Sequence, residues 1–229
     1  MYPMKNIIAI IPARGGSKGI PRKNLKLLNG KPLVWYSIQA ALNSKLISRT
    51  FVSSDDDEIL EFSKLSGADC IKRPDEIAQD TSGVEDSLLH AVETVEKQGV
   101  KVDFVVLLQP TSPHRTAEDI DGAIQTLLKN EADSLLSVVP SHAFIWKKEK
   151  NNARPINYNF ENRPRRQDKE PEFRENGSIY VTKISILKKY KNRLGGKIAL
   201  FVMDEDKGID LDSLFDFDCL EFIISRKNQ

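Results

Sequence analysis

The chain of 229 residues contains only two cysteines and three histidines. Cys70 and Cys219 are far apart and neither belongs to a CxxC pair, so free thiols are expected rather than a disulfide or a metal site. His90, His114 and His142 have neither metal-ligand spacing nor a partner serine in a nucleophile-elbow sequence. A triad hydrolase is therefore not expected.

Segments that direct a chain into or through a membrane are also missing. No run approaches the ~20 apolar residues of a membrane span, and the start has no signal-peptide pattern. Neither sign of charge dominates, because 34 basic residues face 33 acidic ones. We expect a cytoplasmic protein that binds neither nucleic acid nor membranes.

Two common phosphate-binding motifs are absent, although residues 14–31 contain six basic residues and no acidic one. Ile20 follows Gly19 where a Walker loop would have its lysine, and GxGxxG does not occur. Yet Gly15, Gly16 and Gly19 follow an apolar strand-like run, where they let backbone N–H groups approach an anion. A solvated basic turn is the alternative, but the glycines favour a loop for a mononucleotide triphosphate.

Apolar strand-like runs alternate with helix-period segments through most of the chain. The runs cover residues 6–12, 50–53, 69–71, 104–109, 134–139, 177–181 and 198–203. Ser82 with Glu85, Thr116 with Asp119, and Ser54 with Asp57 are expected helix starts. This alternation predicts an α/β fold with a mostly parallel sheet and helices on both faces, whose ligands bind at the carboxyl edge.

The alternation breaks between residues 140 and 176. Charged residues, asparagines and prolines replace it, but five aromatic residues are too many for a disordered tether. We interpret 140–176 as an excursion with an interface, inserted into a core of residues 1–139 and 177–229.

A second charged segment, near the C-terminus, is acidic. In Gly208-Ile209-Asp210-Leu211-Asp212 an extended chain would put both aspartates on one face. Paired carboxylates beside a triphosphate indicate Mg²⁺. An exposed acidic turn capping the last helix is the alternative. Seen together with the basic loop, the pair favours metal-assisted phosphoryl transfer.

A third segment of interest, residues 107–115, covers the end of an expected buried strand and the polar turn after it. Gln109 offers a donor and an acceptor to a sugar or base edge, although a proline-framed turn with a satisfied glutamine remains open. Arginines at 163–166 and Arg174 are suited to bind a carboxylate in a bidentate manner.

These segments together resemble the acylneuraminate cytidylyltransferases, including synthetases for legionaminic acid. The resemblance covers essentially the whole chain in order and is carried by residues 11–24, 108–113, 165–168, 174–180 and 209–212. It implies a Rossmann-like nucleotidyltransferase fold and a homodimer, in which an inserted dimerisation excursion reaches a partner's active site.

The resemblance also assigns roles to residues. Nucleotide binding is expected of Arg14, Gly15, Gly16, Ser17, Lys18, Lys23, Asn24 and Ser82. Catalytic roles are expected of Arg14, Lys23 and Asp212, with Asp210 and Asp212 binding Mg²⁺. Sugar binding is expected of Gln109, Lys147, Arg166, Arg174 and Tyr180, where Lys147 and Arg166 come from the excursion.

The implied reaction is attack of the anomeric hydroxyl of a nine-carbon 2-keto (nonulosonic) acid on the α-phosphorus of CTP. Pyrophosphate leaves, and the base for the hydroxyl stays open between Asp212 and a metal-bound hydroxide. Residues 142–147 depart from the His-Pro pattern of many sialate enzymes, so the acyl pocket is expected to differ. The alternatives are GTP as donor, another sugar acid, a glycosyltransferase and a non-catalytic nucleotide sensor.

Overall fold

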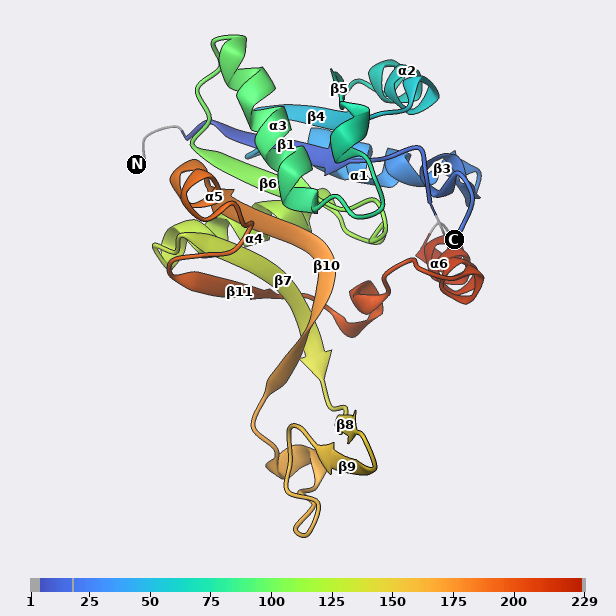
Figure 1. Cartoon of the computed structure of the whole chain (residues 1–229), viewed down its shortest axis with the longest axis vertical. Coiled ribbons are helices and arrows are strands. Elements are labelled where there is room, and N and C mark those ends of the chain that lie inside the picture. Colours follow the sequence, from blue (N-terminus) through green and yellow to red (C-terminus); the bar gives the residue numbers. More distant parts are fainter. Residues whose placement is uncertain (1–4, 18, 228–229) are drawn as a thin grey trace.

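The structure of the chain, a computed structural model, describes residues 5–17 and 19–227. Its centre is a seven-stranded sheet in the order β11-β7-β10-β6-β1-β4-β5 (Figure 1). The strands of this sheet are β1 (Ile7–Pro12), β4 (Arg49–Ser54), β5 (Asp69–Lys72), β6 (Phe104–Leu108), β7 (Ser134–Ser141), β10 (Glu172–Lys183) and β11 (Ile198–Val202). Each of the seven runs identified in the sequence is a strand of this sheet.

Helices cover both faces of the sheet, as the alternation predicts. They are α1 (Leu33–Leu42), α2 (Asp57–Leu65), α3 (Val84–Lys97), α4 (Ala117–Lys129), α5 (Ile184–Tyr190) and α6 (Leu214–Lys227). Residues of α1, α2 and α4 share one buried cluster, and those of α3 and α5 share another with the opposite side chains of the strands. The α6 helix packs apart from both, against Ile20, Leu28 and Leu33.

Parallel pairing holds except around β10. The pairs β1–β4, β1–β6, β4–β5 and β7–β11 are parallel, whereas β10 runs antiparallel to both β6 and β7. The reason is the excursion: β7 runs out of the body and β10 returns beside it, as in a hairpin. The start of β10 therefore lies at the same edge as the carboxyl ends of β1 and β6.

The order of the strands reverses beside β1. From β1 the chain continues to β4 and β5 on one side, then crosses to β6 on the other. Parallel sheets bind ligands outside the carboxyl ends of the strands at such a switch point. The loops that follow β1 and β6 meet there.

Two helix starts lie one or two residues from the expected positions. The N-cap of α2 is Asp56 instead of Ser54, because its side chain accepts the N–H groups of Glu58 and Ile59. The α3 helix begins after Gly83, whose N–H group is accepted by Asp86. The predicted start at Thr116 with Asp119 is confirmed by reciprocal hydrogen bonds.

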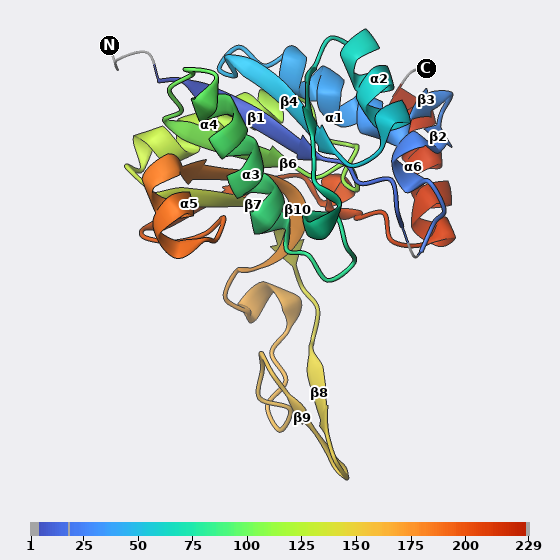
Figure 2. The same cartoon turned by 45° about the horizontal axis from the view of Figure 1, so that its top comes forward.

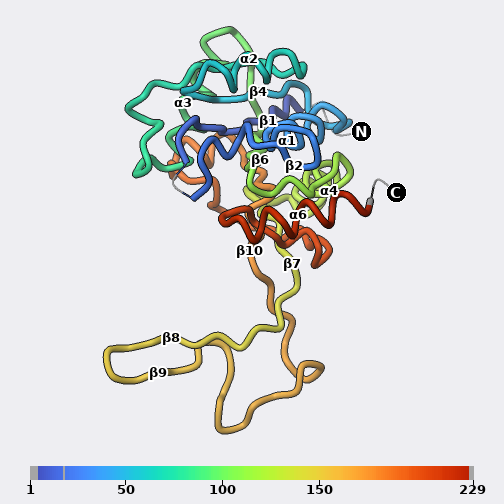
Figure 3. The backbone as a smooth tube through the Cα atoms, turned by 90° about the vertical axis from the view of Figure 1, so that its right-hand side faces the viewer, coloured from blue at the N-terminus to red at the C-terminus, as the bar shows by residue number. Residues whose placement is uncertain are grey.

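The excursion projects from the body as a long arm (Figures 2 and 3). Its root is the pairing of β7 with β10 from Ser141 and Glu172 inward, and its tip carries the hairpin of β8 (Trp146–Glu149) and β9 (Asn152–Pro155). A small two-stranded sheet, β2 (Leu27–Leu28) with β3 (Lys31–Pro32), follows the basic loop. In the described part of the chain, no helix is both long and apolar enough to cross a membrane.

Candidate active site

The basic loop leaves β1 and closes on itself. Asn24, which is buried in the short 3-10 helix Lys23–Leu25, donates its Nδ2 hydrogen bond to the carbonyl oxygen of Arg14 at 2.8 Å. This bond joins the start of the loop to its end. The side chains of Arg14 and Lys23 are thereby held on the same side of a loop whose middle is rich in glycine.

A pocket of about 270 Å³ lies between this loop and the turn after β6. Its lining comes from four segments that each follow a strand or precede a helix at the carboxyl edge. The lining residues are Pro12, Arg14, Gly16, Ser17, Lys23, Asn24, Arg73, Ile77, Gln79, Asp80, Ser82, Gly83, Val84, Ser87, Gln109, Pro110 and Thr111.

Most of the expected nucleotide-binding residues meet in this pocket. Arg14, Gly16, Ser17, Lys23, Asn24 and Ser82 all line it. Gly15 lies beside them, but its N–H group donates to Asp55 at 3.0 Å. Lys18 lies outside the described residues. Arg14 also pairs with the carboxylate of Asp80 at 2.6 Å.

The acidic segment is bound directly to the pocket wall. The N–H group of Leu211 donates to the carbonyl oxygen of Thr111 at 2.9 Å. Lys23 donates to the carbonyl oxygen of Leu211 at 2.8 Å and lies 3.5 Å from the carboxylate of Asp212. A Cβ atom on Gly19 would come 2.8 Å from the carbonyl oxygen of Asp212, so loop and segment are packed together. The two charged motifs of the sequence are therefore one structural unit.

The two aspartates of this segment differ in environment. Asp212 is exposed, whereas Asp210 is half-buried and its Oδ1 accepts no hydrogen bond from the described residues. Burial raises the pKa of Asp210, and the charge of Asp212 adds to this, against a hydrogen bond from Thr111 and the charge of Lys23. A buried carboxylate oxygen without a partner is suited to a cation.

The residues fit a magnesium ion that is shared with a substrate. Among residues 5–17 and 19–227, no group of three or more His, Cys, Asp or Glu side chains is arranged to hold a metal by itself. Mg²⁺ characteristically takes one or two carboxylates and completes its shell with phosphate oxygens and water. Asp210 and Asp212 supply such a pair beside the pocket, next to its lining residues Thr111 and Lys23.

Buried polar contacts fix the acidic segment from behind. Lys207 bonds both carboxylate oxygens of Asp119 at 2.7 Å, with about a tenth of each side chain exposed. The buried Asn176 donates to the carbonyl oxygen of Lys207 at 3.1 Å, and Arg174 donates to that of Gly208 at 2.8 Å. Arg174, expected at the sugar, thus holds the backbone two residues before Asp210.

The turn after β6 is held by a buried arginine. Arg115 donates to Ser37 at 2.7 Å, to Ser178 at 3.1 Å and to the carbonyl oxygen of Gln109. Burial lowers its pKa to about 9, which still leaves it protonated at neutral pH. The hydrogen bond from Arg115 fixes the backbone of Gln109, which lines the pocket.

The remaining expected sugar residues lie away from the pocket in this single chain. Tyr180 is buried on the α3 side of the sheet and its hydroxyl donates to Glu175. Lys147 is exposed on β8, and Arg166 is exposed 3.8 Å from Glu205. The structure therefore does not bring Tyr180, Lys147 and Arg166 together with Gln109.

Sequence reasoning missed Arg73. It directly follows β5, donates to the carbonyl oxygen and hydroxyl of Ser53, and lines the pocket. Burial lowers the pKa of Arg73, the charge of Asp55 opposes this, and nearby Arg14 adds to the lowering. The sequence does contain a signal for Arg73, because it follows an apolar strand-like run. The same kind of position singled out Gln109. Asp80 was also missed, and it lies in an irregular loop where no periodicity points to it.

Known proteins resemble this chain over nearly its full length. A family model described as cytidylyltransferase matches residues 8–225. The N-acylneuraminate cytidylyltransferase A of Danio rerio is 37% identical over 221 residues, which are 95% of this chain and 50% of that protein. The chain thus spans half the length of the fish relatives that it matches.

A bacterial relative and a solved structure match end to end. The CMP-N,N'-diacetyllegionaminic acid synthase of Campylobacter jejuni is 32% identical over 232 residues, covering 98% of this chain and 97% of that one. A structure of CMP:2-keto-3-deoxy-manno-octonic acid synthetase with CTP superposes with a TM-score of 0.75 at 19% identity, over 97% of this chain and all of the other. That likeness confirms the nucleotidyltransferase fold.

Proposed function

Because the chain belongs to the cytidylyltransferase family, we propose that it joins CTP to a nine-carbon 2-keto sugar acid of the sialic or legionaminic acid type. The observation that carries this proposal is the junction of the basic loop with the acidic segment, where Lys23 lines the pocket and contacts Leu211 and Asp212. Relatives named for acylneuraminate and for legionaminate support the sugar class.

The loop would hold the triphosphate of CTP. Glycine N–H groups and the cations of Arg14 and Lys23 neutralise its charge, which is most of what a protein contributes to phosphoryl transfer. Arg73 and the hydroxyl of Ser82 lie further along the same pocket. A guanidinium donates but does not accept, which suits the O2 and N3 acceptors of cytosine.

Magnesium would bind at Asp210 and Asp212 together with the phosphates. When bound, it supplies charge neutralisation to the transferring phosphoryl group and the leaving pyrophosphate. The protein's part is to keep a partly buried carboxylate ready for it. Thr111, Asn176 and Lys207 hold the backbone that presents this carboxylate.

The reaction exchanges a phosphoanhydride bond of CTP for a phosphoester bond to the sugar. The anomeric oxygen forms a bond to the α-phosphorus, the bond from this phosphorus to the bridging oxygen breaks, and pyrophosphate leaves as the hydroxyl loses its proton. Gln109 would orient the sugar with its amide, and Lys23 would stabilise the charge that develops on the phosphates.

The excursion would complete the site in a homodimer. Ile145, Trp146, Ile156, Phe160 and Phe173 each expose over 40% of their surface on this arm. Such an apolar group on a projecting arm supports a protein interface. Lys147 and Arg166 on the same arm would then reach the partner's pocket, where they would meet the sugar carboxylate.

Isotope labelling tests the chemistry. The protein is incubated with CTP, Mg²⁺ and N-acetylneuraminate or legionaminate labelled with ¹⁸O at the anomeric hydroxyl, and the product is analysed by mass spectrometry. We expect a CMP-sugar that retains the label, together with unlabelled pyrophosphate. Label in pyrophosphate, or CDP as a product, would contradict attack on the α-phosphorus.

A further inference from the structure

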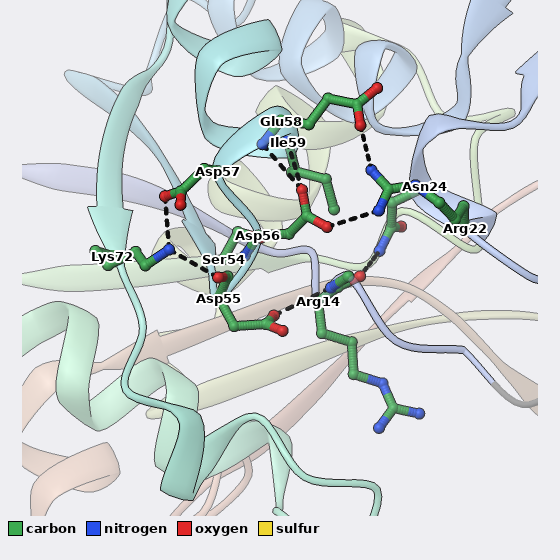
Figure 4. A network of polar contacts seen from close by, with 11 residues as sticks. Arg14, Arg22, Asn24, Ser54, Asp55, Asp56, Asp57, Glu58, Ile59 and Lys72 are labelled. Atoms are coloured by element: carbon green, nitrogen blue, oxygen red, sulfur yellow. Dashed lines mark hydrogen bonds and ion pairs between the residues drawn. The ribbon is translucent and has the colours of Figure 1, made fainter.

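The turn after β4 holds both ends of the phosphate loop (Figure 4). Asp55 accepts the N–H group of Gly15 at 3.0 Å. Asp56 accepts a hydrogen bond from one guanidinium nitrogen of Arg22 at 3.0 Å, and Glu58 accepts one from the other at 2.5 Å. Gly15 and Arg22 are the immediate chain neighbours of Arg14 and Lys23, whose side chains would face the phosphates. One short acidic turn therefore fixes the loop at two places.

Asp56 is itself held rigidly. Its Oδ1 accepts the N–H groups of Glu58 and Ile59 at 2.9 and 3.1 Å, which makes it the N-cap of α2, and its own N–H group donates to Ser54. Only 16% of its side chain is exposed. The other oxygen, Oδ2, accepts the hydrogen bond from Arg22. The carboxylate thus connects the loop to a helix that is packed on the sheet.

The loop touches Asp56 closely at Gly15. A Cβ atom at this position would lie 2.6 Å from Oδ2 and 2.8 Å from Cβ of Asp56, so only glycine fits. The need for glycine here comes from a neighbouring side chain as well as from an anion. The loop backbone is therefore packed directly on Asp56.

Arg22 contacts the acidic turn and does not line the pocket. It is not a lining residue among those described, and its guanidinium extends to Asp56 and Glu58. Its φ of 51° is left-handed, a conformation that is unfavourable for a non-glycine residue. Two charge-assisted hydrogen bonds offset that cost. Arg22 thus differs from Arg14 and Lys23, although all three come from one basic motif.

We propose that Asp56 is a positioning residue for the triphosphate, acting through Arg22 and Gly15. By fixing both ends of the loop, it reduces the conformational entropy that the loop loses when phosphates bind. This inference rests on the proposed function, in which the loop binds the β- and γ-phosphates of CTP. It predicts that the loop's preference for CTP over CMP depends on a carboxylate that touches neither nucleotide.

The test compares Asp56→Asn with Asp57→Asn. Asparagine caps a helix as well as aspartate does, so the first change keeps α2 but removes the charge that attracts Arg22. Asp57 is the matched control, because it is adjacent, 88% exposed and paired with Lys72. Calorimetry with Mg²⁺ measures the dissociation constants of CTP and CMP, and thermal unfolding measures stability.

We expect Asp56→Asn to weaken CTP binding about tenfold, since one charged contact is lost, and to change CMP binding less than about twofold. Arg22→Gln should behave alike, and the double variant should be no worse than either single one. Asp57→Asn should resemble the wild type in both constants.

An unchanged CTP/CMP ratio in Asp56→Asn would overturn the inference. Equal weakening of both nucleotides with a lower melting temperature would also overturn it, because Asp56 would then be only a helix cap. If the wild type binds CTP no better than CMP, the triphosphate role of the loop fails, and the inference fails with it.

Discussion

Lys23 and Asp212 lie 3.5 Å apart, Nζ to Oδ1, and so connect the first functional loop of the chain to one of its last. The same ammonium group donates to the carbonyl oxygen of Leu211. A cation beside Asp212 lowers the repulsion between this carboxylate and that of Asp210. Under the proposed function, the same contact would place Lys23 and the metal ion on one triphosphate.

Removal of the Asp212 carboxylate should abolish most turnover and leave the fold intact. We expect Asp212→Ala to cut turnover on the order of a hundredfold or more, the usual size of a lost metal or electrostatic contribution. Thermal unfolding should change little, because Asp212 is exposed. Asp218→Ala, also exposed and on α6, is the control. Near-normal turnover in Asp212→Ala would remove the metal assignment.

The carboxylate of Asp210 should lower the stability of the folded protein at neutral pH. Its pKa is raised above the ordinary 3.8, so the folded state favours the protonated form, and stability falls as pH rises through the folded pKa. We expect Asp210→Asn to unfold at a higher temperature than the wild type at neutral pH. The difference should disappear at pH values below the ordinary pKa.

Added Mg²⁺ serves as the control for the comparison of Asp210→Asn with the wild type. Added Mg²⁺ with nucleotide should raise the melting temperature of the wild type more than that of Asp210→Asn, since ligand binding to the folded state stabilises it. Equal stabilities at all pH values would show that the carboxylate of Asp210 is not strained by its burial.

The buried ion pair behind the acidic segment should matter for stability. We expect Lys207→Met to lower the free energy of unfolding by about 3 kcal/mol, because it leaves Asp119 buried without its cation. Urea denaturation measures this. Lys188→Met is the control, since its pair with Glu96 is more exposed and should contribute under about 1 kcal/mol. Similar losses in both variants would contradict the argument.

Mixed dimers test whether the arm acts in the partner's site. Lys23→Ala disables the pocket, and Arg166→Ala disables the arm. If Arg166 acts across the dimer, co-refolded mixtures of the two inactive variants should regain up to about a quarter of wild-type turnover, because half of the dimers are mixed and each contains one intact site. No recovery would favour the contact of Arg166 with Glu205 of its own chain.

Most of the fold could be predicted because its strands are continuous apolar runs ended by glycine, proline or polar residues. The exceptions depend on distant pairing. Residues 172–176 are polar apart from Phe173 and form no apolar run that predicts a strand, yet β10 begins at Glu172 because β7 pairs with it there. The cap of α2 was misplaced because residues 53–57 offer five side chains able to cap, and only three-dimensional packing selects Asp56.

The site could be predicted as far as motifs follow strands. Arg14, Lys23 and Gln109 line one pocket because they follow neighbouring strands. Arg73 was overlooked, although it follows β5. The placement of Tyr180 could not be derived from its motif, because its ring packs in the buried cluster formed with α3 and α5, under Arg193 at 4.7 Å. Its role in binding the sugar stays a prediction.

Pyrophosphate release tests the central claim most directly. The purified protein is incubated with Mg²⁺ and either CTP or GTP, against N-acetylneuraminate, legionaminate and pseudaminate derivatives. The account predicts release with CTP and a sialic or legionaminic acid, and none with Asp210→Asn under the same conditions. Release with GTP alone, or no release with any pair despite measurable CTP binding, would contradict it.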